Sequence, residues 1–339
     1  MKYRQHRAVL LLLFLLLIQS FPVHSQDDPA YCGSFPPIEK IAWDFSNELV
    51  ALSTIEGVVI VTSEFEEVTV LDNGLSELPE DLKLGGISAL NGLDWHPTEP
   101  LFAYVTNTTG GIPALRLVNI QDWTILEELR LPNITVSDLE FSPDGEYIAI
   151  AGWIRSDVLG PGSNILIWDI PLNSEENPPI RLPITRQGIN AIAWNPEGTH
   201  IAAAGDNWLL YIWDVANPEF PKTYEWHESP VNDVRWSSEY LYTIGDFGTL
   251  VRWLPESHYP DEILVSHHAA SHVIGVSEVS GIVSTGDESG EIIVHFPRSG
   301  RILFNNHNTA ITGLEWDNEG TRFLSADASG KLCMWEFEQ

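Results

Sequence analysis

The sequence predicts an all-β fold, a β-propeller of seven four-stranded antiparallel blades. Three observations predict it. One short pattern recurs along the 339 residues. Its mean spacing is about 45 residues, which is the length expected for one four-stranded blade. Within each copy apolar and polar residues alternate, as they do in a strand whose side chains point to opposite faces in turn.

The recurring pattern is the predicted first strand of each blade. Two apolar residues three positions apart are followed, two positions later, by an aromatic residue. The aromatic residues of the six clear copies are Trp43, Trp95, Phe141, Trp194, Trp236 and Trp316. A weaker seventh copy, residues 273–278, lies in the one large gap between the others. Seven copies predict seven blades.

A polar turn and two further strands follow the aromatic residue. The turns carry Pro, which presets φ, and then Gly145 or Gly198, which supplies a positive φ. The second strand that follows is rich in small residues, which suit a crowded inner position. The third strand ends in an aromatic residue at Trp168, Trp213, Trp253 and Trp335, whereas the sixth copy has His295-Phe296 instead.

These copies resemble the WD-repeat family over nearly all of residues 38–336. The pairs Trp168-Asp169 and Trp213-Asp214 match the signature dipeptide of that family, and His227 matches the histidine that opens a repeat. The resemblance implies a ring of antiparallel blades. It does not identify a function, because this fold hosts many roles.

The family often links four side chains by hydrogen bonds: the opening His, a second-strand Ser or Thr, a turn Asp and the third-strand Trp. The last copy offers His307, Ser325 and Trp335. The position six residues before the Trp holds Ser329 there and Phe247 in the fifth copy, where the family has Asp. The sequence therefore argues against a complete tetrad.

The last copy stops after its third strand, so its blade needs a fourth. The resemblance implies that the segment before the first copy, residues 28–37, supplies it and closes the ring. The two cysteines support this independently, because Cys32 lies in that segment and Cys333 in the last third strand. Neighbouring antiparallel strands bring Cβ atoms to about 4.5–5.5 Å. We expect a Cys32–Cys333 disulfide in a secreted protein.

Residues 1–25 are predicted to be a secretory signal peptide, and residues 26–339 the propeller. Three basic residues precede an apolar run of 11 residues, which is too short for the roughly 20 that span a bilayer. Cleavage after Ser25 leaves 14 basic residues against 48 acidic ones, a formal charge near −34. Such a charge excludes a nucleic-acid binder and a basic membrane-surface protein. We expect an extracellular or periplasmic monomer without a membrane span.

Three tryptophans that the repeat does not require are predicted to share one rim of the ring. Trp153 and Trp208 precede third strands, and Trp226 precedes a first strand. The resemblance places both kinds of turn on the same rim, together with Phe247. The same turns carry four acids, namely Asp206, Asp246, Asp287 and Asp327. Packing against a blade edge and ordinary turn chemistry are the alternative interpretations of these residues.

The leading hypothesis is a non-enzymatic scaffold that binds a protein or peptide with a basic patch through these rim residues. No catalytic motif is present. The alternative is a propeller hydrolase or lyase acting on a small molecule or sugar in the central funnel. A weaker option is a shell protein stabilised by Ca²⁺ on the acidic rim.

No cofactor and no metal site are predicted. His258, His267, His268 and His272 lie close together in sequence, but no Cys or acid recurs beside them at ligand spacing. Asn107 and Asn133 would be acceptors for N-glycosylation only in a host that glycosylates.

Overall fold

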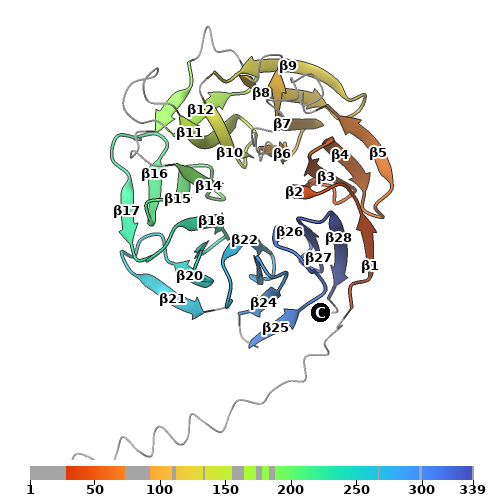
Figure 1. The fold of residues 1–339 in the computed structure, drawn as a ribbon. Helices are drawn as coiled ribbons and strands as arrows, with labels where there is room; N and C mark the ends of the chain where they lie inside the picture. The colour runs from red at the N-terminus through yellow and green to blue at the C-terminus, as the bar shows by residue number, and fades with distance from the viewer. Residues whose placement is uncertain are drawn as a thin grey trace, which may run out of the picture.

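The fold is a ring of seven antiparallel sheets around a common axis (Figure 1). The computed structural model describes residues 28–72, 92–108, 112–132, 134–154, 164–172, 178–182, 188–265, 267–297 and 300–337. Within these ranges every sheet has four strands and no helix is present. The prediction of seven four-stranded blades is confirmed. The predicted signal peptide and Asn133 lie outside the described residues.

The strands follow one another outward from the axis in each blade, except in the last. Blade one contains β2 (Ile38–Trp43), β3 (Leu49–Thr54), β4 (Gly57–Thr62) and β5 (Glu67–Leu71). Blade two contains β6 (Leu93–Trp95), β7 (Leu101–Thr108), β8 (Ile112–Asn119) and β9 (Thr124–Arg130). Blade three contains β10 (Ile134–Phe141), β11 (Tyr147–Ile154), β12 (Ile165–Asp169) and β13 (Ile180–Leu182).

The remaining blades repeat this arrangement. Blade four contains β14 (Ile189–Trp194), β15 (His200–Gly205), β16 (Leu209–Asp214) and β17 (Lys222–Glu225). Blade five contains β18 (Val231–Trp236), β19 (Leu241–Gly245), β20 (Thr249–Trp253) and β21 (Pro260–Val265). Blade six contains β22 (Ser271–Val276), β23 (Val283–Asp287), β24 (Ile292–Phe296) and β25 (Gly300–Phe304). Blade seven contains β26 (Ile311–Trp316), β27 (Arg322–Asp327), β28 (Lys331–Glu336) and β1 (Tyr31–Ser34).

Burial explains why the second strands are rich in small residues. Ala202, Ala203 and Ala204 of β15 are fully buried, because this strand is covered by neighbouring blades on both faces. Outer strands such as β9 alternate between exposed and half-buried residues, since only one face meets the core. The hydrophobic core is therefore divided into clusters that lie between blades rather than at one centre.

The N-terminal strand completes the last blade, as predicted. Strand β1 pairs antiparallel with β28, and Cys32 lies opposite Cys333 in that register. The two cysteines form a disulfide across the pair. Figure 1 shows β1 on the outside of the ring beside the C-terminal strand. Both ends of the described chain therefore contribute to one sheet, which closes the ring by supplying the fourth strand of blade seven.

The expectation that no hydrogen-bonded tetrad forms is wrong for blade seven. His307 Nδ1 lies 2.7 Å from Asp327 Oδ2, and His307 Nε2 lies 2.7 Å from the hydroxyl of Ser325. Trp335 donates its indole N–H to the same hydroxyl at 2.8 Å. The acid lies two residues earlier than assumed, at the last position of β27, where Asp327 Oδ1 also accepts the backbone N–H of Ser329.

Candidate functional site

The turns that carry the predicted rim residues all lie on one edge of the ring. In a four-stranded antiparallel sheet the second and fourth strands run in the same direction, so their C-terminal ends meet at one edge. Trp153 lies near the end of β11, Trp208 in the β15–β16 turn and Phe247 in the β19–β20 turn. Trp226 follows β17. The set spans blades three, four and five.

These four side chains are large, apolar and about half exposed to solvent. The exposed fractions are 51% for Trp153, 49% for Trp208, 46% for Trp226 and 66% for Phe247. A packed core residue would be almost fully covered, so packing against the blades accounts for only part of their surface. We call these four residues the aromatic rim.

Glycine makes room for the first of these aromatics. A side chain at Gly188 would lie 3.2 Å from the Trp153 ring and 3.3 Å from Asp206 Oδ2. Both groups therefore lie over the same glycine, at the boundary between blades three and four. Trp153 and the carboxylate of Asp206 are thus neighbours in space although 53 positions separate them in the chain.

Trp208 adopts a backbone conformation that normally favours glycine. Its φ is 69°, and its N–H bonds the carbonyl of Gly205. Blade five has the same turn, with Gly248 at φ 66° in the equivalent position, bonded to Gly245. A bulky residue in this left-handed region costs roughly 1–3 kcal/mol. Blade four therefore keeps a strained tryptophan at a position where its neighbour has glycine.

Trp226 and Phe247 line one open pocket of about 390 Å³. Glu225 and Glu228 line the same pocket, and both are exposed. Between them His227 is anchored through Nε2 to the hydroxyl of Thr243 at 2.7 Å. Burial lowers the pKa of His227 to about 4, so a neutral imidazole leaves the two glutamates uncompensated. Sequence reasoning missed these two acids, although they flank Trp226 directly.

Two of the predicted rim acids are held by asparagines on the first strands. Asn190 donates to Asp206 Oδ1 at 3.2 Å and to the backbone carbonyl of Val231 at 3.0 Å. Asn232 makes the same pair of bonds in the next blade, to Asp246 at 2.8 Å and to the carbonyl of Ser271 at 2.9 Å. Each asparagine occupies a β-bulge, which turns its side chain out of the ladder. The acids are fixed in place before any partner arrives.

The structure places the other two predicted rim acids in the interior. Asp287 is 2% exposed and Asp327 is 1% exposed. Each bonds its own turn through Oδ1 and faces a buried histidine through Oδ2. These two acids occupy the last position of the second strand, where blades four and five have Gly205 and Gly245. Their carboxylates are buried there, so they cannot contribute to a surface that meets a partner.

The axis of the ring is lined by charged residues of the first strands, and burial raises the pKa of several acids there. Burial raises the pKa of Asp94 to about 6 and that of Glu315 to about 7, and it also raises the pKa of Glu140 and Asp233. Such perturbed acids are the feature expected of a catalytic funnel.

Hydrogen bonds show what most of these acids do. Asp94 accepts the backbone N–H of Phe141 at 2.7 Å, and Glu140 accepts that of Trp194 at 3.0 Å. Asp233 accepts the backbone N–H of Ile274 at 2.7 Å. Lys40 pairs with Asp138, and Arg235 lies 3.7 Å from Asp233. Each carboxylate therefore ties the first strand of one blade to the first strand of the next. The pKa values are raised because these carboxyl groups are buried where they hold neighbouring blades together.

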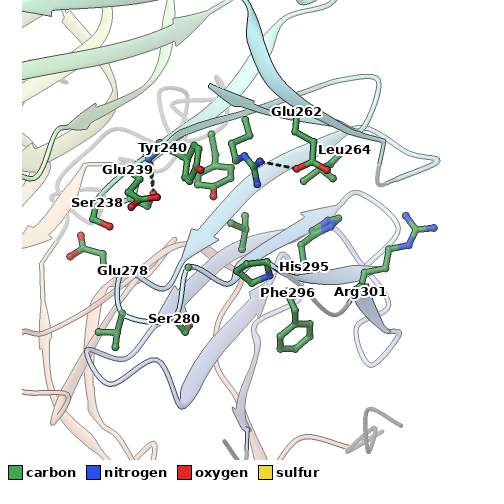
Figure 2. Close-up of a pocket in the computed structure, with 18 residues that line it drawn as sticks. Ser238, Glu239, Tyr240, Glu262, Leu264, Glu278, Ser280, His295, Phe296 and Arg301 are labelled. Carbon is green, nitrogen blue, oxygen red and sulfur yellow. Dashed lines mark hydrogen bonds and ion pairs between the residues drawn. The ribbon is translucent and has the colours of Figure 1, made fainter. Parts of the chain in front are cut away.

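A second cavity, of about 580 Å³, lies between blades five and six (Figure 2). Its origin is the third strand of blade six, where His295 occupies the register position that Trp253 and Trp335 occupy in blades five and seven. The core cluster at this boundary holds five buried hydrophobic residues, against ten or more in each other cluster of the described chain. An imidazole fills less space than an indole, so the boundary stays open.

One arginine in the wall of this cavity is already paired. Arg252 lies over the ring of Tyr240, 4.5 Å from its centre, and bonds Asp261 at 2.6 Å. Figure 2 shows His295 between the two blades, whereas Phe296 points away from blade five. The Phe296 ring instead lies 6.1 Å from that of Phe337. The cavity opens among the turns on the edge opposite the aromatic rim.

Comparison with known proteins agrees with this architecture. Residues 181–214 and 299–336 match the family model described as "WD domain, G-beta repeat". The chain contains WD40 repeats. The matched segments include the third strands of blades four and seven, which carry Trp213 and Trp335.

Several curated proteins are similar to this chain. Actin-interacting protein 1 of Drosophila melanogaster is 24% identical over 297 residues, which cover 82% of this chain and 44% of the relative. Meiotic fizzy-related protein 1 of Schizosaccharomyces pombe is 22% identical over 188 residues, covering 53% and 44%. The human serine-threonine kinase receptor-associated protein is 30% identical over 123 residues, covering 36% and 31%. The matched region spans less than half the length of these relatives.

The names of two of these relatives describe association with other proteins, actin and a serine-threonine kinase receptor. WD-repeat propellers of this kind are typically scaffolds for protein interaction rather than enzymes. Among the described residues no helix is long and apolar enough to cross a bilayer.

Proposed function

We propose that this chain is a secreted, non-enzymatic propeller that binds a protein or peptide through the aromatic rim. The observation that carries the proposal is the exposure of four large aromatic side chains on one edge of three consecutive blades. Trp and other aromatics supply much of the energy of protein interfaces, because they bury a large area with few rotatable bonds. The pocket between Trp226 and Phe247 offers a place for one side chain of a partner.

The acids around the aromatic rim favour a partner with a basic patch. Asp206, Asp246, Glu225 and Glu228 surround the aromatic side chains, and the whole chain has a formal charge of −31. Opposite charge accelerates association and is screened by salt. The hydrogen bonds that hold Asp206 and Asp246 in place reduce the entropy lost on binding. The chain would act as a monomer.

The N-terminal sequence and the disulfide support the proposed secretion. Residues 1–25 have the basic, apolar and small-residue segments of a signal peptide. The Cys32–Cys333 bond is stable in an oxidising compartment and is seldom found in a reducing cytosol. N-terminal sequencing of the protein exported by its native host would test this. The expected first residue is Gln26, and a cytosolic protein that begins at Met1 would contradict it.

Affinity capture from the native secretome tests the binding proposal. Wild type is compared with a Trp153→Ala/Trp208→Ala variant. The matched control is Phe220→Ala/Tyr259→Ala, because Phe220 and Tyr259 are 86% and 74% exposed in turns on the opposite edge. Partners retained by wild type and the control variant, but lost by the rim variant, support the proposal. Equal recovery by all three proteins contradicts it.

A further inference from the structure

The boundary between blades five and six has lost a pair of aromatic rings that the boundaries beside it keep. In blades five and seven the tryptophan of the third strand packs toward the preceding blade and meets an aromatic residue of its outer strand. The ring centres of Trp253 and Tyr224 lie 5.5 Å apart, and those of Trp335 and Phe304 lie 4.5 Å apart. Blade six has His295 at the tryptophan position, so the first ring of the pair is replaced by a smaller one.

The second ring of the pair is missing as well. The outer-strand position of Tyr224 and Phe304 is held by Leu264 in blade five, since each of these residues lies opposite the same position of the third strand. The residue paired with the histidine is also small. It is Val283, whereas blade seven has Phe323 there, stacked 5.6 Å from its tryptophan. Three matched positions at one boundary therefore have smaller side chains.

These differences leave space for a planar aromatic molecule. The cavity of about 580 Å³ lies within the range of about 300–1,000 Å³ that is usual for small-molecule sites. Space left by a missing large apolar side chain is known to bind aromatic molecules such as benzene. Tyr240 and Tyr242 line the cavity on the side of blade five, with their ring centres 6.4 Å apart. Such rings favour another aromatic ring in an offset or edge-on contact.

One end of the cavity is acidic. Glu239 belongs to the turn between β18 and β19 of blade five, and Glu278 to the turn between β22 and β23 of blade six. Both are exposed, and neither forms an ion pair with another described residue. Figure 2 shows these two acids at one end of the cavity and Arg301 at the other. Arg252 does not compensate them, because it bonds Asp261.

The histidine does not oppose a positively charged ligand. Burial lowers the pKa of His295 to about 4, so its imidazole is neutral at pH 7. Its Nε2 atom is buried and has no hydrogen-bond partner among the described residues. The cavity thus has an uncharged interior lined by rings and aliphatic side chains, and two uncompensated carboxylates at its entrance.

We propose that the cavity between blades five and six binds a free arylalkylamine, which is a planar aromatic ring joined by a short chain to an ammonium group. The ring would fill the space that the aromatic pair occupies at the neighbouring boundaries, and the ammonium group would lie near Glu239 and Glu278. The site opens on the edge opposite the aromatic rim, so it is independent of the protein-binding proposal.

Calorimetric titration of the full chain with tryptamine tests the proposal. The expected result is one bound molecule with a dissociation constant of about 1 mM or lower. Indole has the same ring without the charge and should bind about 3–30-fold more weakly, because ion pairs at a solvent-exposed site contribute modestly. Indole-3-propionate, which carries a negative charge, should bind more weakly than indole. Absence of saturable tryptamine binding would overturn the proposal.

Two variants locate the site. His295→Trp fills the cavity with an indole, so the affinities for tryptamine and for indole should both fall at least about 10-fold. Unchanged tryptamine affinity in this variant, with the circular dichroism of the folded wild type, would overturn the proposal. Glu239→Gln/Glu278→Gln changes only exposed side chains, so the fold should be retained. It should weaken tryptamine binding to the level of indole and leave indole binding unchanged.

A matched control uses the acids of the aromatic rim. Glu225→Gln/Glu228→Gln makes the same charge change beside the pocket of Trp226 and Phe247, on the opposite edge. Tryptamine affinity should remain that of wild type, and a loss in this variant alone would overturn the assignment because the amine would then bind at the rim.

A capped tryptophan–lysine dipeptide carries the same ring and charge and distinguishes a free amine from a peptide. It should bind more weakly than tryptamine, because its additional amide groups would lose water without gaining partners. Tighter binding of the dipeptide would assign the cavity to a protein partner and overturn the proposal of a free amine.

Discussion

Removal of the disulfide should weaken the ring at the blade that both ends of the chain build. The change is Cys32→Ser together with Cys333→Ser, which removes a bond between residues 301 positions apart. For a loop of this length, chain entropy predicts a loss of about 5–6 kcal/mol in the free energy of unfolding. Measured disulfides usually contribute less, about 2–5 kcal/mol. We therefore expect the double variant to lose about 2–6 kcal/mol of its free energy of unfolding.

Urea unfolding of the oxidised wild type and the double variant measures this loss, with the slopes compared so that a change in the unfolded state is recognised. Strand β1 is mostly exposed and pairs only with β28. Hydrogen exchange should therefore increase first at the amides of β1 and β28. A double variant that unfolds within 1 kcal/mol of wild type and retains slow exchange in β1 would refute the reasoning.

Three further changes have outcomes that the structure determines. Trp208→Gly should be more stable to urea than Trp208→Ala by about 0.5–1 kcal/mol, because a backbone φ of 69° is unfavourable for any residue with a Cβ atom. Equal stability of the two variants would show that the turn is not strained. His295→Trp should raise the free energy of unfolding by about 1–2 kcal/mol, because an indole fills the cavity between blades five and six. The indole N–H can also donate to Thr285, as that of Trp253 does to Thr243. A lower melting temperature of the variant would contradict this. Burial raises the pKa of Glu315 to about 7, so the folded state binds a proton more tightly than the unfolded state. The free energy of unfolding should therefore fall as the pH rises from about 4.5 through 7. Glu315→Gln should flatten that fall, and an unchanged pH profile would count against the assignment.

The architecture could be predicted from the sequence because it depends on features that recur. Each blade repeats an apolar pair, an aromatic residue and a turn, so single exceptions such as Phe141 or His295 do not hide the period. Ring closure was predictable for a different reason. The last blade is one strand short, and Cys32 and Cys333 fall where the missing strand and its neighbour must lie.

The details of the sites depend on which position next to the turn holds the acid, and the repeat pattern does not specify that position. Asp206 and Asp246 lie one position beyond the end of the second strand and stay near the surface, whereas Asp287 and Asp327 occupy its last position and face buried histidines. All four acids directly follow a Gly or Ala, so they look alike in the sequence.

The functional groups that the sequence did not predict come together only through contacts between strands or blades. Trp153 meets Asp206 over Gly188, which belongs to the next blade. Glu239 and Glu278 line one cavity because their turns belong to neighbouring blades. Both are consequences of packing rather than of spacing along the chain.

The dissociation constant of the partner recovered by affinity capture tests the central claim, that the aromatic rim is the binding surface. It should be measured for wild type, Trp226→Ala/Phe247→Ala and the control variant Phe220→Ala/Tyr259→Ala. The account predicts that the rim variant binds about 10–100-fold more weakly while the control matches wild type, since each anchoring aromatic contributes more than about 1 kcal/mol. A rim variant that binds as tightly as the control would contradict the claim.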